Sequence, residues 1–166
     1  MSVLVLVLGL VFFLGVHSVR IVADDWRSAQ IARRGEGPWK GLVSLVSLAG
    51  FALIVWGYAM ARTQPLVLWA PPRWAPHLAS LLVLFAFVLL VAAYVPKNGI
   101  KGWVHHPMLL GVMLWAIAHL LANGTLADLL LFGSFLVWAV LDFIAARRRD
   151  HAAGDPHLLG TLAGSL

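Results

Sequence analysis

Five long apolar segments, separated by short polar or basic stretches, constrain this chain more than any other feature. Each is close to the roughly 20 residues that a helix needs to cross about 30 Å of hydrocarbon while satisfying its own backbone hydrogen bonds. Apolar residues make up 61% of the chain and charged residues 11%, which is more apolar than a soluble domain tolerates. The sequence therefore predicts an all-α, polytopic transmembrane bundle of about five spans. They run from about Ser2 to Ala23, Gly41 to Ala61, Ala75 to Val95, Val104 to Ala122 and Leu126 to Ala146.

The twelve Lys and Arg residues lie mostly in alternate connections between these segments. Only Arg62 and Arg73 lie between the second and third spans, and none lies between the fourth and fifth. The positive-inside rule then places the N-terminus outside and the C-terminus in the cytoplasm. The net charge of +5 thus reports topology and gives no reason to expect a nucleic-acid partner.

Segment ends and flanks give further expectations. No basic residue precedes the first span and no small-residue cleavage site follows it, so we expect a retained helix rather than a signal peptide.

A bacterial inner membrane is the simplest location, with membrane lipid as the surrounding partner. Residues 1–149 are expected to form the transmembrane domain, and residues 150–166 a cytoplasmic or interfacial tail. Thr125 is a candidate N-cap for the fifth helix.

Ionisable residues inside the spans are candidates for function, because polar groups at membrane depth are energetically costly. Three stand out: His17, His119 and Asp142. Asp142 is expected to pair with one of the arginines at 147–149, which is a structural role. Arg20 and Asp24 fall on roughly the same helical face as His17 and could pair with each other.

His17 and His119 each have a structural and a functional interpretation. The structural interpretation is a single hydrogen bond to a neighbouring helix. The functional one is ligation of one haem iron by two neutral imidazoles from separate helices. The estimated depths do not match well, because His17 lies about 8 Å and His119 about 20 Å from the inner edge of the hydrocarbon. His106 is therefore the alternative second ligand.

The stretch from Trp103 through His105, His106 and Pro107, continuing to His119 and Gly124, resembles the NnrU family of bacterial membrane proteins. The histidine segment from Gly15 to Arg20 is also similar to that family. The resemblance covers most of the five-span region and implies an association with denitrification and nitric oxide metabolism.

The NnrU family is related to plant 15-cis-zeta-carotene isomerase, a membrane protein with haem b and histidine ligands. The resemblance implies His17 and His119 as the ligands of a haem b iron. Trp115 shares a helical face with His119, and Arg20 could face a haem propionate, because a guanidinium pairs well with a carboxylate. The isomerase has a cysteine three residues before its second ligand, where this chain has Ala116, so isomerase activity does not follow from the resemblance.

Three functions remain open from the sequence. The leading one is a haem b protein with redox or isomerase activity and a membrane redox partner or nitric oxide reductase as its associate. The second is a haem-free assembly protein that supports maturation of nitric oxide reductase. A small transporter is the weakest, because the chain shows no internal repeat and no pair of broken helices in matching halves.

Overall fold

The structure is a computed structural model, and it describes residues 1–96 and 98–154. Four of its helices are long and apolar enough to cross a membrane, and a shorter apolar helix of 16 residues lies beside them. The prediction of an all-helical bundle with about five spans is confirmed. The helices are α1 (Ser2–Val22), α2 (Asp24–Arg34), α3 (Glu36–Ala61), α4 (Ala75–Tyr94), α5 (Gly99–Val104), α6 (Pro107–Ala122) and α7 (Leu126–Ala152).

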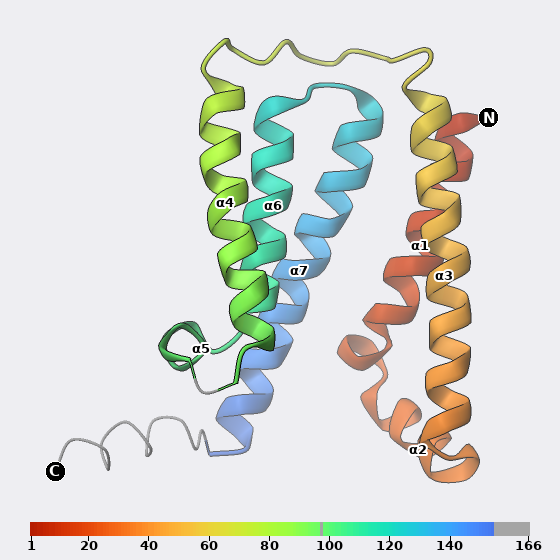
Figure 1. Cartoon of the computed structure of the whole chain (residues 1–166). Helices are drawn as coiled ribbons and strands as arrows, with labels where there is room; N and C mark the ends of the chain where they lie inside the picture. The colour runs from red at the N-terminus through yellow and green to blue at the C-terminus, as the bar shows by residue number, and fades with distance from the viewer. Residues whose placement is uncertain (97, 155–166) are drawn as a thin grey trace, which may run out of the picture.

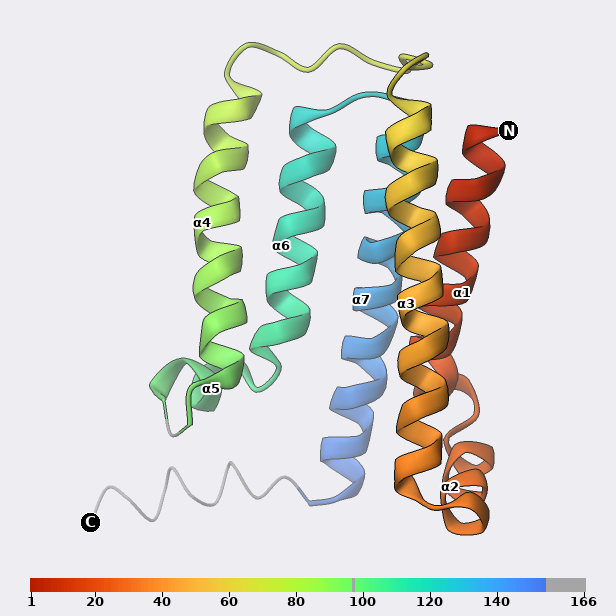
Figure 2. The ribbon, with the colours of Figure 1, turned by 45° about the vertical axis from the view of Figure 1, so that its right-hand side comes forward.

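The five apolar helices stand side by side (Figures 1 and 2). Contacts join α3 to α1, α1 to α7, α7 to α6 and α6 to α4. We call the end where α1 and α7 finish the basic end, since Arg20 and residues 147–149 lie there. The opposite end, where α1 begins and α6 turns into α7, is called the outer end. Because the first helix begins at one end and the last finishes at the other, the arrangement fits the predicted odd number of crossings.

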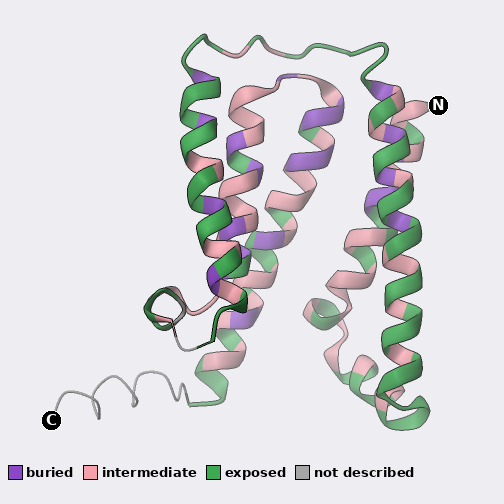
Figure 3. Ribbon diagram, viewed as in Figure 1, coloured by how far each residue is buried: buried purple, intermediate pink, exposed green. Residues whose placement is uncertain are grey.

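Most of the apolar side chains face outward. In each of the four long helices, 17% of the most apolar window is buried inside the protein. Leu45, Phe87 and Val91 leave more than half of their surface exposed, and the outer faces of α3 and α4 are largely exposed (Figure 3). A water-facing surface of this kind would be very costly. The helices therefore suit a multi-pass protein in a lipid bilayer.

Helices α1 and α3 approach each other through glycines. A Cβ atom on Gly9 would lie 2.6 Å from the backbone nitrogen of Ile54, and one on Gly50 would lie 2.7 Å from that of Phe13. Gly57 lies equally close to the backbone of α1. Small residues let membrane helices pack backbone against backbone, where dispersion contacts and not hydrophobic burial hold them together. This contact fixes the position of α1, which carries His17.

Three of the apolar helices have a boundary that differs from the sequence prediction by more than one residue. The fourth apolar helix begins at Pro107 rather than Val104, because His105 adopts a positive φ of 60° that interrupts the helix. His106 is the N-cap and Pro107 the first helical residue, a position that proline favours. The remaining two boundaries, of α3 and α7, extend beyond the predicted spans to Glu36 and Ala152.

The connection after the first span contains the helix α2, which the sequence analysis does not predict. Helix α2 begins with two acidic residues and ends with Arg33 and Arg34, which suits the dipole of a helix. Trp26 of α2 packs edge-on against Trp39 at the start of α3, with ring centroids 5.8 Å apart. The helix thus lies at the basic end beside the start of α3.

Candidate functional site

His17 lies near the basic end of α1, where its ring is held by its own helix. Its Nδ1 is 2.6 Å from the carbonyl oxygen of Phe13, and the two rings stack with centroids 4.5 Å apart. A carbonyl oxygen can only accept, so Nδ1 carries a proton, and in the neutral ring the lone pair is on Nε2. Within the described part of the chain, Nε2 has no hydrogen-bond partner. The interhelical hydrogen bond of the structural interpretation is therefore not formed.

His119 in α6 repeats the same local geometry. Its Nδ1 lies 2.8 Å from the carbonyl oxygen of Trp115, and its ring stacks on Phe132 of α7 with centroids 4.4 Å apart. Trp115 contacts the ring as well, at 5.0 Å. Here too, no other described residue bonds to Nε2. Both intramembrane histidines thus present an unused nitrogen lone pair.

The two histidines contact α7 at different levels. His17 packs edge-on against Trp138, whereas His119 stacks on Phe132, six residues earlier. Six residues correspond to about 9 Å along a helix axis. Phe13, Phe135 and Trp115 form an unbroken series of ring contacts that leads from one histidine to the other, with centroid separations of 4.5 to 5.7 Å. In this arrangement, aromatic rings occupy the path between the two imidazoles.

His17 opens instead onto a pocket of about 400 Å³ at the basic end, which we call the basic-end pocket. His106 lines the same pocket, and its Nε2 lies 2.7 Å from Oδ2 of Asp150. Of the predicted site residues, His17, Arg20 and His106 are therefore together, and His119 and Trp115 are in contact with each other elsewhere. The basic-end pocket is lined by His17, Arg20, Ala93, His105, His106, Pro107, Met108, Leu109, Trp138, Asp142 and Arg149.

The expected ion pairs at this end have mixed outcomes. Asp142 pairs with Arg149, with Oδ1 and Nη2 3.6 Å apart, as the sequence predicted. The suggested pair between Arg20 and Asp24 is wrong, because Asp24 bonds to Arg27 at 3.3 Å, three residues further along α2. The chain breaks direction at Ala23, so Asp24 no longer lies on the same helix as Arg20. Arg20 is left facing the basic-end pocket.

Sequence reasoning missed Asp128, which is 4% exposed and is the buried charged residue of the described chain. Its carboxylate accepts hydrogen bonds from the backbone and hydroxyl of Thr125, and Oδ1 accepts one of 2.6 Å from the hydroxyl of Tyr58 in α3. Thr125 is confirmed as the N-cap of α7 and forms a capping box with Asp128. The spacing Thr-x-x-Asp was the signal that could have found this residue.

The outer end is tied further by backbone hydrogen bonds. The extended connection between α3 and α4 lies against the turn between α6 and α7, and Gly124 accepts bonds from Leu68 and Trp69. Leu126 donates to the carbonyl of Leu66 in the same contact. These bonds hold α3 and α7 together at the end where Tyr58 reaches Asp128.

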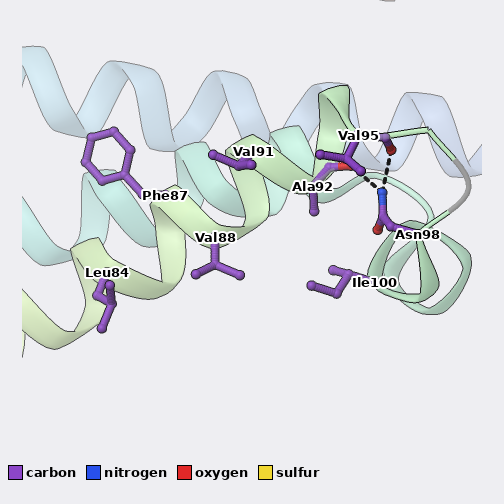
Figure 4. A pocket seen from close by; sticks show the side chains of 8 residues that line it. All are labelled: Leu84, Phe87, Val88, Val91, Ala92, Val95, Asn98 and Ile100. Atoms are coloured by element: carbon purple, nitrogen blue, oxygen red, sulfur yellow. Dashed lines mark hydrogen bonds between the residues drawn. The ribbon is translucent and has the colours of Figure 1, made fainter.

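A groove of about 410 Å³, lined by apolar side chains and by Asn98, lies on the edge helix α4, apart from all of these residues (Figure 4). The side chain of Asn98 closes one end by donating to the carbonyls of Ala92 and Val95. Leu84 and Val88 lie along the groove on the side of α4 away from α6. Its chemistry suits lipid chains and offers no group for catalysis.

The described residues do not form a site for a free metal ion. No three His, Asp or Glu side chains among residues 1–96 and 98–154 are grouped to hold a metal ion. An iron here would depend on a macrocycle and two imidazoles. A histidine that ligates iron usually donates its other ring N–H to a carbonyl or carboxylate, as His17, His119 and His106 can all do.

Comparison with known proteins gives one result. The sequence model of a family described as NnrU protein matches residues 5–163 of the 166-residue chain. No curated protein and no solved structure matches the chain.

Proposed function

The chain belongs to the NnrU protein family, and we propose that it binds haem b inside the membrane through His17, with His119 or His106 as the second axial ligand. Family membership fits a membrane protein associated with denitrification. A bacterial inner membrane, with a redox protein or nitric oxide reductase as partner, is part of this proposal.

One observation carries the proposal: intramembrane histidines whose Nε2 atoms have no partner in the described chain. An unpaired polar atom at this depth is costly, and both rings already have Nδ1 bonded to a carbonyl. The remaining lone pair is the one that binds iron. The same tautomer in both rings supports ligation over a purely structural role.

The choice of second ligand follows from two different observations. The resemblance to the carotene isomerase favours His119, with Trp115 against the cofactor. The basic-end pocket favours His106, which lines it together with His17. For His119 and His17 to share one iron, the rings of Phe13 and Phe135 must move from their present contacts. In either case Arg20 is the candidate partner of a propionate, because a guanidinium pairs well with a carboxylate.

A haem held by two imidazoles can change oxidation state while both iron positions stay filled, which favours electron transfer or haem sensing over bond-making. The surrounding chain would exclude water and orient the rings. Isomerisation of an apolar polyene is disfavoured here, since it would require one ligand to leave and Ala116 offers no sulfur in its place.

Visible spectra of the detergent-purified full chain test the proposal. We expect a Soret band that is lost in His17→Ala while the variant stays helical and monodisperse. His77→Ala is the matched control, because His77 is exposed on the first turn of α4. Loss of the band in His119→Ala but not in His106→Ala assigns the second ligand to α6, and the reverse result assigns it to the basic-end pocket.

An unchanged Soret band in all three variants rejects these histidines as the ligands, and no band in the wild type rejects haem binding. The second result would favour a haem-free protein that supports assembly of nitric oxide reductase. Growth on nitrate with and without the gene measures the link to denitrification under either outcome.

A further inference from the structure

The basic-end pocket contains more hydrogen-bond donors than its own chain uses. Arg20 forms no ion pair or hydrogen bond with another described residue. Arg149 is 3.6 Å from Asp142, too far for a hydrogen bond, so its guanidinium N–H groups are not consumed by that pair. The indole Nε1–H of Trp138 is buried without an acceptor among the described residues. All three side chains line the pocket.

The charge of the lining is positive. Arg20 from α1 and Arg149 from α7 face one carboxylate, that of Asp142, even when the histidines are neutral. Oxygen atoms of an anion accept bonds from guanidinium groups in a planar, two-pronged geometry. Basic pockets between membrane helices on the cytoplasmic side are suited to phospholipid headgroups. The chemistry of the pocket thus points to an oxyanion.

A groove lined mostly by apolar side chains, with Ser18 and Ser134 among them, lies beside the pocket between α1 and α7. Trp138 lines both the basic-end pocket and the adjoining cavity of about 460 Å³, whose other walls include Leu14, Leu130 and Val137. A further cavity of about 410 Å³ shares Leu14 and Leu130 and continues along α1 toward Val7. The anion site and the groove therefore share a wall at Trp138. A small soluble anion would not fill such a groove, whereas an acyl chain fits it.

We propose that this protein binds an anionic phospholipid, with its phosphate between Arg20 and Arg149 and an acyl chain in the groove between α1 and α7. The inference comes from the pocket and the groove and does not depend on haem. A haem propionate is the other possible source of an oxyanion at Arg20. The two sources differ because a phospholipid also places an acyl chain in the groove, whereas a propionate does not.

Native mass spectrometry of the detergent-purified full chain, titrated with phosphatidylglycerol or phosphatidylcholine, tests the proposal. We expect a one-to-one phosphatidylglycerol adduct whose affinity falls about tenfold or more in Arg20→Gln and in Arg149→Gln, since each change removes a charge-assisted hydrogen bond to the phosphate. Arg148→Gln is the matched control, because it removes the same charge from the neighbouring exposed position on α7. Equal losses in Arg148→Gln and Arg149→Gln would overturn the site.

A second variant separates lipid from other anions without changing charge. A Cβ atom on Gly133, which lines the groove, would meet only Leu129 Cδ1 at 3.7 Å, so Gly133→Leu fills the groove at little cost to folding. We expect this variant to lose the adduct while it stays helical and monodisperse. An adduct that survives in Gly133→Leu, or that inorganic phosphate displaces completely, would overturn the lipid assignment. A Soret band lost in Arg20→Gln with no lipid adduct in the wild type would assign the oxyanion to haem.

Discussion

The outer and basic ends of the bundle are built by different means. At the outer end, Asp128 is buried and bonded by Thr125 and Tyr58, and the α3–α4 connection donates to Gly124. At the basic end, His106 at the start of α6 hydrogen-bonds to Asp150 of α7, and Asp142 pairs with Arg149 within α7, with all four side chains 20 to 33% exposed. One end is closed by satisfied hydrogen bonds, and the other opens onto a pocket.

This difference indicates where binding can occur. Groups that are already bonded to each other, such as Asp128 and Tyr58, have little left to offer a ligand. Arg20, Trp138 and the Nε2 atom of His17 have no such partners in the described chain. The outer end therefore supplies stability, and the basic end leaves donors and acceptors unused for a ligand.

The largest expected effect comes from the α1–α3 contact that supports both ends. In Gly50→Leu the new side chain would meet the backbone of Phe13 at 2.7 Å, so α1 and α3 must separate. Overpacking usually costs about 1 to 3 kcal/mol, and more where backbone must move. We expect no folded, monodisperse protein on size-exclusion chromatography. Gly41→Leu, which has open space around it, is the control and should behave as wild type. Normal recovery of Gly50→Leu would show that this contact does not hold α1.

Asp128→Ala is expected to have the next largest effect on stability, because it removes the hydrogen bonds that close the outer end. The change strands the hydroxyl of Tyr58, at about 1 to 3 kcal/mol, and removes the acidic half of the capping box. Thermal unfolding in detergent, followed by tryptophan fluorescence, measures the loss. Tyr58→Phe should cost only about 1 kcal/mol, and the double variant less than the sum of the two. Strict additivity would mean that the Tyr58–Asp128 bond does not contribute to stability.

Much of the fold could be predicted from the sequence because its causes are local. A run of apolar residues is enough to define a span, and the N-cap at Thr125 and the pair of Asp142 with Arg149 lie within one helix. The break before α6 was not predicted, because nothing in the residue type of His105 requires a positive φ. Helix α2 was missed because its polar composition looks like that of a loop.

The candidate site was harder to predict, since its geometry depends on contacts distant in the sequence. Tyr58 and Asp128 are 70 residues apart, so no spacing rule could join them. Placing His17 and His106 in one pocket depends on how α1, α6 and α7 pack. The sequence did identify His17 and His119 as unusual, but it could not show that their Nδ1 atoms bond to their own helices.

The smallest expected effect on stability is that of a substitution at the basic end. Asp150→Asn removes the charge that faces His106, but both side chains are partly exposed, and such pairs contribute about 0 to 1 kcal/mol. We expect an unfolding temperature within a few degrees of wild type, with Asp25→Asn on the exposed side of α2 as the matched control. A loss as large as that of Asp128→Ala would show that the basic end is locked as firmly as the outer end. A small loss, by contrast, would show that the contact between His106 and Asp150 contributes little to the stability of the basic end.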